Sequence, residues 1–327
     1  DLYTLVNGEL DEERSQVGAA NDDDYDEFNP SFALTYDWTD DINAYMRIAT
    51  GYKAGGSSES APVDQFDNTV DPETVTSYEL GLKSYWFNRR LRANFAVFES
   101  DFEDMQFNFS VDPQDASIVQ SYNAGEATIR GLEADMVLQA TDSLGFTLQY
   151  AYLDTDLEEV VALPGTIFDP EANPSAEGFS AVGDNIADSF TIPYAPEHSL
   201  LVAADATLYQ GDGFTLGAHL DYRYQSSVFA QSTAGRDVPG RNNLEISSYG
   251  IFNARISLAY QFARGDVLEF ALWGKNITDE DYRLQIIGLG SGAPVENQVA
   301  QVIYGYVQRA TVWSEPARFG IDMNYVF

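Results

Sequence analysis

The stretch FTLGAHLDYRYQ, Phe214–Gln225, decides the fold class of this chain. One set of alternate positions reads Phe, Leu, Ala, Leu, Tyr, Tyr, and the other reads Thr, Gly, His, Asp, Arg, Gln. Strict alternation of this kind is the period of a β-strand with one apolar face and one polar face. The pattern returns at 252–262 and 319–327, and helical spacing is sustained nowhere in the sequence. The sequence therefore predicts an all-β protein.

The connections between the predicted strands are of two kinds. About twelve strands are predicted, near 1–14, 28–38, 42–53, 74–87, 90–102, 118–141, 144–156, 197–209, 213–226, 246–262, 266–277 and 316–327. Tight turns alternate along the chain with long loops at 15–27, 54–73, 103–117, 157–196, 227–245 and 278–315. A soluble sandwich has no reason to place every long loop at one end, whereas outer-membrane barrels combine short periplasmic turns with long extracellular loops. The alternation predicts an antiparallel transmembrane β-barrel.

Composition excludes several other classes of protein. The 327 residues contain 52 Asp and Glu against 17 Lys and Arg, a net charge of -35. Phosphate contacts require Lys and Arg, so this balance excludes a nucleic-acid partner. The chain has 0 Cys, which excludes disulfides and thiolate chemistry, and it has no run of about 18 apolar residues that could form a membrane helix. Most of the excess negative charge falls in the long loops, which we expect to form an acidic extracellular surface.

Charged side chains also occur within the strands, on the alternate face that carries the polar residues. A membrane barrel is apolar outside and polar inside, so this face is predicted to line the lumen. The predicted lumen network comprises Arg47, Glu79, Lys83, Glu133, Asp135, His219, Asp221, Arg223, Arg255, Glu269 and Asp322. The bases and acids are interleaved, which predicts a mixed-charge wall.

Five segments carry a family resemblance. They are IATGYKAGG at 48–56, YELGLKS at 78–84, NAGEATIRGLEAD at 123–135, GKNITDEDY at 274–282 and EPARFGIDMNYVF at 315–327. In this order and spacing they resemble the C-terminal barrel of TonB-dependent outer-membrane receptors. The closing Tyr325 and Phe327 resemble the terminal strand that outer-membrane proteins present to the barrel assembly machinery.

The resemblance also predicts what this sequence lacks. Members of the family have an N-terminal plug with an energy-coupling box inside a 22-stranded barrel, and no plug precedes the strands here. An open half-barrel would leave two strand edges unpaired in lipid, at a cost of several kcal/mol per unsatisfied group. Residues 1–327 are therefore interpreted as the C-terminal portion of the barrel, with the plug and early strands absent from the chain. Pairing with another chain is the alternative.

Ligand recognition is expected in the long loops and the upper lumen. Rings stack on sugars, corrinoids or aromatic chelators, and Arg binds carboxylates in a bidentate manner. The candidate binding residues are Phe107, Phe109, Tyr282, Arg283, Tyr304, Tyr306, Arg309 and Trp313. For Phe107 and Phe109, extension of a strand with packing on neighbouring loops is an equal alternative. The acidic exterior favours a neutral or cationic cargo over an anionic one.

The sequence gives little support for a catalytic site or a metal site. The chain has 2 His, no G-x-S-x-G motif and no His cluster. His219 beside Asp221 and Arg223 is better explained as part of the lumen network than as a general base, so no enzyme is predicted. Asp22, Asp24 and Asp26 offer oxygen ligands for Ca²⁺ or Mg²⁺ without the spacing of a known calcium loop. A solvated acidic loop is the alternative, and no other cofactor is predicted.

The leading functional hypothesis is active import across the outer membrane of a Gram-negative bacterium. A multi-pass barrel would bind a scarce nutrient such as a siderophore, vitamin or oligosaccharide and pass it through a plug-gated lumen. The resemblance implies as partners lipopolysaccharide, the barrel assembly machinery and, through the missing plug, the inner-membrane TonB energy-coupling complex. A passive porin is the alternative, followed by a surface enzyme or a structural surface protein.

Overall fold

A single large antiparallel sheet dominates the computed structural model of the chain. The structure describes residues 2–6, 9–16, 24–57, 69–112, 119–177, 180–232, 241–288 and 309–327. The sheet contains β3 (Ser31–Thr39), β4 (Ile42–Lys53), β7 (Glu73–Trp86), β8 (Leu91–Ser110), β9 (Val119–Thr141), β10 (Leu144–Val160), β11 (His198–Gly211), β12 (Phe214–Gln225), β15 (Tyr249–Gln261), β16 (Val267–Lys275) and β19 (Arg318–Val326).

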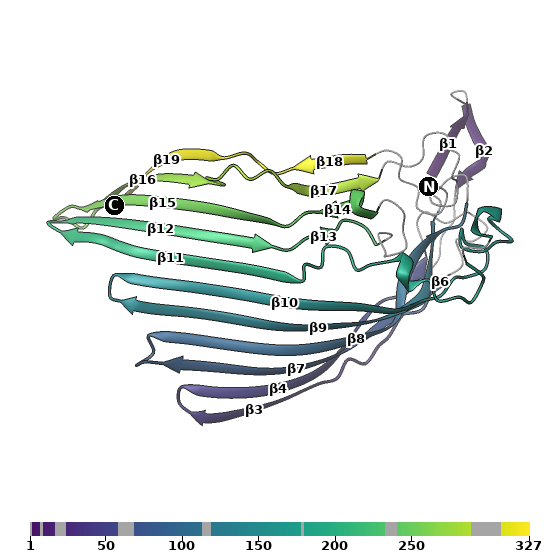
Figure 1. Cartoon of the computed structure of the whole chain (residues 1–327), viewed down its shortest axis with the longest axis horizontal. Coiled ribbons are helices and arrows are strands. Elements are labelled where there is room, and N and C mark those ends of the chain that lie inside the picture. The colour runs from purple at the N-terminus through teal and green to yellow at the C-terminus, as the bar shows by residue number, and fades with distance from the viewer. Residues whose placement is uncertain are drawn as a thin grey trace.

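The 11 strands form a meander in the order β19-β16-β15-β12-β11-β10-β9-β8-β7-β4-β3. Figure 1 shows the tight turns at one end of the strands and the long connections at the other. The turn between β11 and β12 has the Asp-Gly sequence of a two-residue hairpin, with positive φ angles of 51° at Asp212 and 79° at Gly213. The predicted all-β, antiparallel fold is confirmed, and the sheet is open in the described residues, with β3 and β19 at its edges.

Smaller elements lie outside this sheet. In the described residues they form two short hairpins, two pairs of two-residue strands and three 3-10 turns. These are β1 (Leu2–Val6) with β2 (Glu9–Gln16), β5 (Gly56–Ser57) with β6 (Thr69–Val70), β13 (Val228–Phe229) with β14 (Glu245–Ile246), β17 (Arg283–Gly288) with β18 (Arg309–Trp313), and η2 (Pro174–Ala176), η3 (Ala187–Ser189) and η4 (Arg241–Leu244).

Two sequence-based assignments are corrected. The first predicted strand, 1–14, is instead a hairpin in which β1 pairs with β2 and neither joins the main sheet. The loop predicted at 103–117 begins late, because β8 continues to Ser110 and pairs with β9 there. β2 (ELDEERSQ) is almost entirely polar and so shows little alternation of apolar and polar positions, whereas in β8 Met105, Phe107 and Phe109 continue the alternation into the segment predicted as a loop.

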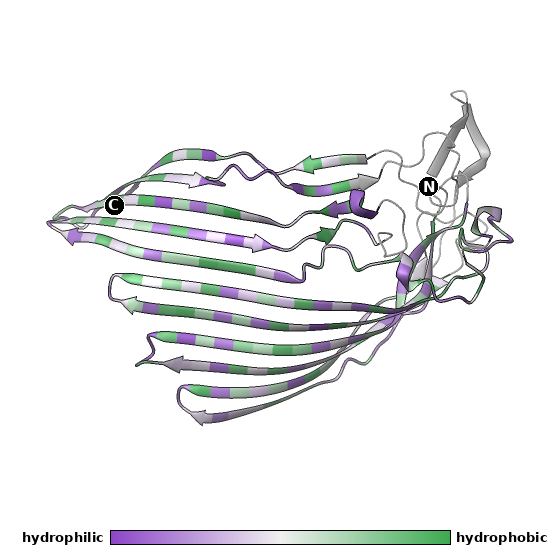
Figure 2. Cartoon of the chain, viewed as in Figure 1, coloured by the Kyte–Doolittle hydropathy of each residue, from purple (hydrophilic) through white to green (hydrophobic). Residues whose placement is uncertain are grey.

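The two faces of the sheet differ in chemistry. Figure 2 shows hydrophilic and hydrophobic residues in alternation along the strands. Large apolar side chains on one face are left uncovered, for example Leu80 at 58% exposure and Leu272 at 55%. The opposite face carries ion pairs. No helix in the described part of the chain is long and apolar enough to cross a membrane.

Strands β8, β9 and β10 are longer than a membrane crossing requires. They have 20, 23 and 17 residues, whereas a membrane strand needs about 9 to 11. Their upper parts bury apolar side chains against the segment 161–190, in a cluster we call the loop core. The loop core comprises Phe109, Ala124, Val160, Ala162, Ile167, Phe168, Ala176, Ile186 and Phe190. Its centre is dry, with Phe109 1% exposed and Val160 0%.

A second, smaller cluster joins neighbouring loops at the same end. Val228, Ala230, Leu244, Ile246 and Ile286 are buried together. Main-chain hydrogen bonds connect this region to the segment before β11: the N–H of Thr191 donates to Ser232 O at 2.7 Å, and that of Tyr194 to Phe229 O at 3.0 Å. The described long loops are therefore packed on one another.

Arginine side chains connect neighbouring turns at the tight-turn end of the sheet. Arg89, in the turn between β7 and β8, donates to Asp41 in the neighbouring turn at 2.7 Å. Arg90 donates to the carbonyl oxygens of Gln139 at 2.9 Å and Ala140 at 2.7 Å, in the next hairpin. These exposed contacts contribute little to stability individually, but they link adjacent turns across the sheet.

Candidate functional site on the polar face of the sheet

The strand ladder brings all of the predicted lumen residues onto one face. Arg47 lies opposite Glu79, and Asp135 lies opposite Gln149, which continues across the ladder to Leu201 and Arg223. His219 lies opposite Arg255, and the same face continues through Glu269 and Asp322 to the edge of the sheet. This shared face follows from the two-residue period of the strands. That it lines a lumen remains a prediction.

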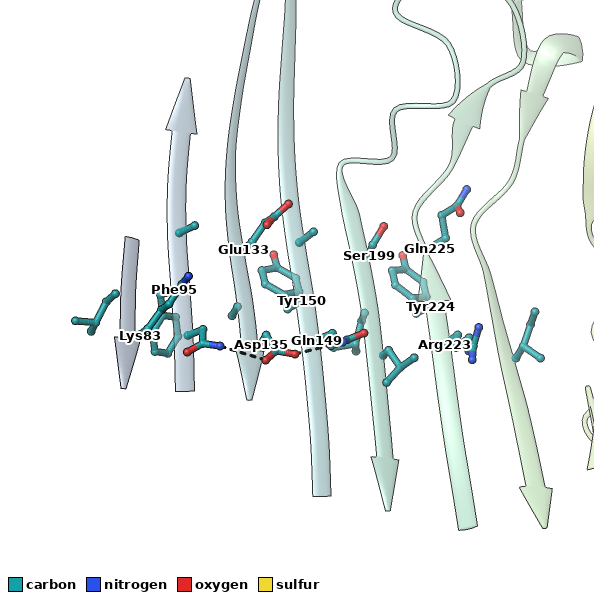
Figure 3. Close-up of a pocket in the computed structure, with 18 of the residues that line it drawn as sticks. Lys83, Phe95, Glu133, Asp135, Gln149, Tyr150, Ser199, Arg223, Tyr224 and Gln225 are labelled. Carbon is teal, nitrogen blue, oxygen red and sulfur yellow. Dashed lines mark hydrogen bonds between the residues drawn. The ribbon is translucent and has the colours of Figure 1, made fainter. Parts of the chain in front are cut away.

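A hollow of about 730 Å³ lies on this face and is the candidate functional site. It is lined by residues of β4, β7, β8, β9, β10, β11, β12 and β15 and by Tyr282. One hollow can touch eight consecutive strands only if the sheet curves around it, so this face is concave. Figure 3 shows side chains of both charges among the lining residues, including Lys83, Glu133, Asp135 and Arg223.

Asp135 is the most heavily hydrogen-bonded acid in the hollow. Arg92 donates to it at 2.8 Å, Gln149 at 3.2 Å and Asn94 at 3.5 Å. Figure 3 marks the last two of these contacts, which join β8 and β10 to β9. The donors satisfy the carboxylate within the wall, so Asp135 is held in place by its neighbours.

Lys83 and Tyr45 form a cation–π pair on the same wall. The Lys83 ammonium lies 5.2 Å from the centroid of the Tyr45 ring, within the range of a cation–π contact. The ring in turn occupies the space above Gly81, where an added Cβ would lie 2.2 Å from it. Glycine at this position therefore lets the ring lie against the wall.

The network continues along β11, β12 and β15. His219 Nδ1 lies 2.8 Å from Asp205 Oδ1, and His219 Nε2 lies 3.4 Å from Asp221 Oδ2. Asp221 also accepts from Arg223 at 3.3 Å and Asn253 at 2.9 Å. With these partners His219 joins two strands, which agrees with the network interpretation of this residue.

Arg255 forms the corresponding junction at the C-terminal edge. It donates to Glu269 at 2.9 Å and to Asp322 at 2.7 Å. Trp273 Nε1 donates to the second Asp322 oxygen at 3.1 Å. The last strand is thereby connected to β15 and β16 by side chains as well as by the backbone ladder.

A tyrosine stack marks the long-loop edge of the hollow. The rings of Tyr249 and Tyr282 are 3.8 Å apart and 15° from parallel, and both residues line the hollow. Burial raises the pKa of the Tyr282 phenol, with a smaller contribution from the Glu315 carboxylate. Both effects favour the neutral phenol, which presents ring surface and a hydroxyl to the hollow.

The other predicted ligand-binding residues are divided among different environments. Arg283 lies over the Trp313 ring at 5.8 Å and donates to Glu245 O at 3.1 Å, on the β17–β18 hairpin. Tyr304 and Tyr306 lie outside the described residues, as does the Arg309 side chain. Among the members of this set that the structure describes, only Tyr282 lines the hollow.

Phe107 and Phe109 require a correction. Both lie in β8, and Phe109 stacks near Tyr122, Phe168 and Phe190 with ring centroids 5.6 to 5.9 Å apart. With 1% of its surface exposed, Phe109 has no face to offer a ligand. Phe107 packs beside it at 6.2 Å. The alternative of strand extension and loop packing therefore describes both residues.

The predicted metal site lies only partly within the described residues. Asp24 and Asp26 are described, whereas Asp22 lies outside the described residues. Within the part of the chain that the structure describes, no group of three His, Cys, Asp or Glu side chains is arranged to hold a metal ion. A divalent cation held by Asp22, Asp24 and Asp26 stays a prediction.

Sequence reasoning missed Tyr249, Gln225 and Gln149 as lining residues. Each lies on the polar face, so the alternation contained the signal, but an uncharged polar residue does not stand out in a strand. The arrangement offers hydrogen bonds, ring surface and charges of both signs to a bound molecule. A curved antiparallel sheet with one such polar face and one uncovered apolar face is typical of the wall of a membrane β-barrel.

Comparisons with known proteins identify the kind of barrel. Residues 5–277 match the family model described as TonB dependent receptor-like, beta-barrel, and the chain therefore belongs to this family. Membership implies an outer-membrane β-barrel and confirms the resemblance seen in the sequence. The matched proteins are receptors, in agreement with the prediction that the chain is no enzyme.

Two curated relatives are receptors from pseudomonads. The ferric-pyoverdine M114 receptor PbuA of Pseudomonas sp. (strain M114) is 26% identical over 255 residues, 77% of this chain and 26% of that protein. The metal-pseudopaline receptor CntO of Pseudomonas aeruginosa is 25% identical over 128 residues, 39% of this chain and 17% of that protein. The matched part of the chain thus spans about a quarter of the length of PbuA and less than a fifth of the length of CntO.

Solved structures share the fold. The ferric yersiniabactin uptake receptor FyuA from Yersinia pestis superimposes with a TM-score of 0.62 at 16% identity, covering 91% of this chain and 37% of FyuA. The ferric preacinetobactin receptor BauA from Acinetobacter baumannii gives 0.58 at 16% identity, covering 91% of this chain and 36% of BauA. At these identities the likeness establishes the barrel wall alone.

Proposed function

We propose that the chain is part of the barrel wall of a receptor that imports a metal chelate of siderophore type across the outer membrane of a Gram-negative bacterium. The supporting observation is the match over 77% of the chain to a receptor for a ferric siderophore. The hollow on the concave face agrees with it, because a polar wall with ring surface suits a chelate rather than an apolar molecule.

The remaining parts of the receptor belong to the same proposal. Further strands, contributed by residues outside this chain, would pair with the edges at β3 and β19 and close the barrel, and a plug would lie in its lumen. Energy would come from the inner-membrane TonB complex acting on that plug. Lipopolysaccharide would surround the exposed apolar face.

The structure of the C-terminal strand supports the proposal of a further partner, the barrel assembly machinery. Phe327 is 98% exposed, and the Tyr325 hydroxyl is hydrogen-bonded to Arg264 and Asp266 of the adjacent turn. A fixed Tyr325 beside an uncovered Phe327 presents an aromatic end to a recognition surface. Deleting Phe327 should lower the amount of folded, heat-modifiable barrel in the outer membrane, and unchanged amounts would contradict this role.

Uptake of radiolabelled iron chelates tests the import function. The full-length receptor containing this chain is expressed in cells that lack their own ferric-chelate receptors, and uptake is measured with and without a protonophore. Active import predicts uptake that the protonophore abolishes. Uptake that persists with the protonophore would indicate a passive channel, and absence of uptake for every chelate tried would reject the import function for that set.

A further inference from the structure

We propose that the transported chelate is neutral or cationic and that polyanionic chelates are poor substrates. This inference rests on the proposed import function and specifies the chemical class of its cargo. It follows from three properties of the described residues: the charge at the long-loop end, the partners of the cations, and the composition of the hollow.

The long-loop end carries a dense set of carboxylates, which we call the acidic rim. Residues 154–197 contain acids but no Lys or Arg. The rim comprises Glu99, Asp101, Glu103, Asp104, Asp154, Asp156, Glu158, Glu159, Asp169, Glu171, Glu177, Asp184 and Asp188. Because these segments lie at the long-loop end of the strands (Figure 1), a ligand that approaches the sheet from this end meets a negative potential.

The cations described at this end are already engaged. Each has an acid, a carbonyl oxygen or an aromatic ring as its partner. The pairs are Arg130 with Glu99 at 2.5 Å, Lys53 with Glu73 at 3.9 Å, Arg318 with Glu315, Arg241 over Phe229 at 4.4 Å, Arg283 over Trp313 at 5.8 Å and Lys275 over Trp273 at 5.9 Å. An anionic chelate would have to displace these contacts to obtain a positively charged partner.

The hollow provides no positively charged clamp either. Its two described cations are Lys83, lying over the Tyr45 ring, and Arg223, whose Nε is 3.3 Å from Asp221. Glu133 and Asp135 line the same hollow. A wall with equal numbers of acidic and basic side chains suits a ligand without excess negative charge, because a polyanion would lose hydration without gaining a net favourable potential.

The upper edge of the hollow suits an uncharged surface. The stacked rings of Tyr249 and Tyr282 form a flat contact, and the Tyr249 hydroxyl donates to Gln225 Oε1 at 3.2 Å. Phenol and amide groups recognise neutral amides, hydroxamates and hydroxyls by hydrogen bonding and packing. This edge would bind the organic part of a chelate whatever the charge of its metal.

The charge preference should be largest in low salt. Fields of this kind change association rates by about 10-fold to 1,000-fold, and they are screened beyond about 8 Å at physiological ionic strength. Raising the salt concentration should therefore slow the binding of a cationic chelate and speed the binding of a polyanionic one. A neutral chelate should respond little.

The test compares three ferric chelates of similar size on the full-length receptor in outer-membrane vesicles. They are a trihydroxamate with a free amine, which is singly positive, a cyclic trihydroxamate, which is neutral, and a tricatecholate, which is triply negative. Binding rates are measured at low and high salt. We expect the cationic chelate to bind at least about 10-fold faster than the tricatecholate at low salt, with the ratio falling as salt rises.

A pair of variants shows whether the acidic rim causes the preference. Glu171→Lys with Glu177→Lys reverses two exposed charges of the rim, and Asp40→Lys with Asp142→Lys makes the same change at the tight-turn end. The rim variant should reduce the ratio of cationic to anionic binding rates by about 3-fold or more. The tight-turn variant should leave it unchanged.

The possible outcomes separate the two proposals. Tricatecholate binding equal to or faster than cationic binding at low salt would overturn the charge inference and leave the import function standing. Equal effects of the two double variants would also overturn it, because the rim would then not be the cause. Failure of all three chelates to bind would reject the import function for these chelates and the inference that rests on it.

Discussion

Strands β8, β9 and β10 expose apolar side chains in their lower parts and bury them in their upper parts. In the lower part Val97 is 46% exposed and Leu132 36% exposed, on the apolar face. In the upper part Phe109 is 1% exposed and Val160 0%, within the loop core. The strands are continuous across this change. The difference shows that the solvent, and not the strand, decides where apolar groups lie.

Lipid and water account for this difference. In a bilayer the hydrocarbon chains cover apolar side chains, so the outer face needs no protein packed against it. Above the bilayer the same residues would contact water, and burying them yields about 25 cal/mol per Å² of apolar surface. The segment 161–190 folds over the strand ends and supplies that cover. Truncating an apolar side chain should therefore have different consequences in the two parts.

The largest effect is expected from Phe109→Ala. Replacing a buried Phe by Ala costs about 3 to 5 kcal/mol in a packed core, and here the cost falls on the loop core. Protease should cleave within 161–190 much faster in intact cells, whereas the amount of folded barrel should change little. Val97→Ala on the apolar face is the control, and it should leave proteolysis unchanged.

A contrary result would be loss of folded barrel with Phe109→Ala while the loop remains resistant. The loop core would then be required for assembly of the membrane strands, and the two parts of the strands would not be independent.

The next effect distinguishes the two faces of the membrane part. Leu220 is 46% exposed on the apolar face, and Arg223 lies on the polar face of the same strand. Placing Arg at a lipid-facing position near the midplane costs about 2 to 4 kcal/mol, so Leu220→Arg should impair insertion, measured as the heat-modifiable fraction. Arg223→Leu should insert nearly as well as the wild type while changing transport or conductance. The reverse pattern would mean that the faces are assigned the wrong way round.

A smaller effect is expected within the polar face. Arg255→Met would leave Glu269 and Asp322 without their shared donor. Because the three side chains are 35%, 33% and 44% exposed, water screens both ion pairs and the loss of stability should be small. The midpoint of thermal unfolding of the barrel should fall slightly. Lys83→Met, which removes a cation without an ion-pair partner in the described structure, serves as the comparison and should have a smaller effect.

The sequence predicts the membrane part of this chain much better than the rest. Alternation places Leu220 and Arg223 on opposite faces because lipid and lumen impose opposite polarities on neighbouring positions. The tight turns can be predicted equally well, as the turn at Asp212 and Gly213 shows. These features are local, so a short window of residues contains them.

The upper part follows from contacts that no local pattern records. Phe109 and Phe190 are 81 positions apart, yet their rings lie 5.8 Å from each other. Exposed and buried aromatic residues look alike in a long loop, which explains why the sequence leaves both ligand binding and packing open for Phe109 and misses Tyr249 at the end of a strand. For the same reason β17 and β18 are hidden within a predicted loop.

The smallest effect concerns a carboxylate that orders the loop over the core. Asp169 Oδ2 accepts from the Gly165 N–H and Oδ1 from the Glu171 N–H, each at 2.8 Å, and these donors lower the pKa of Asp169 below its ordinary value. A lowered pKa in the folded state stabilises the loop above the ordinary Asp pKa, about 3.9. That contribution disappears as pH falls through the folded-state value.

Asp169→Asn can accept at only one oxygen, so it should lose one of these bonds at every pH. Hydrogen exchange of the amides at 163–173, compared between variant and wild type at matched pH to cancel intrinsic rates, should be modestly faster in the variant at pH 7. The difference should shrink as acid protonates the wild-type carboxylate. An equal difference at neutral and acidic pH would show that the charge of Asp169 does not order this loop, and the upper part would then depend on apolar packing around Phe109 alone.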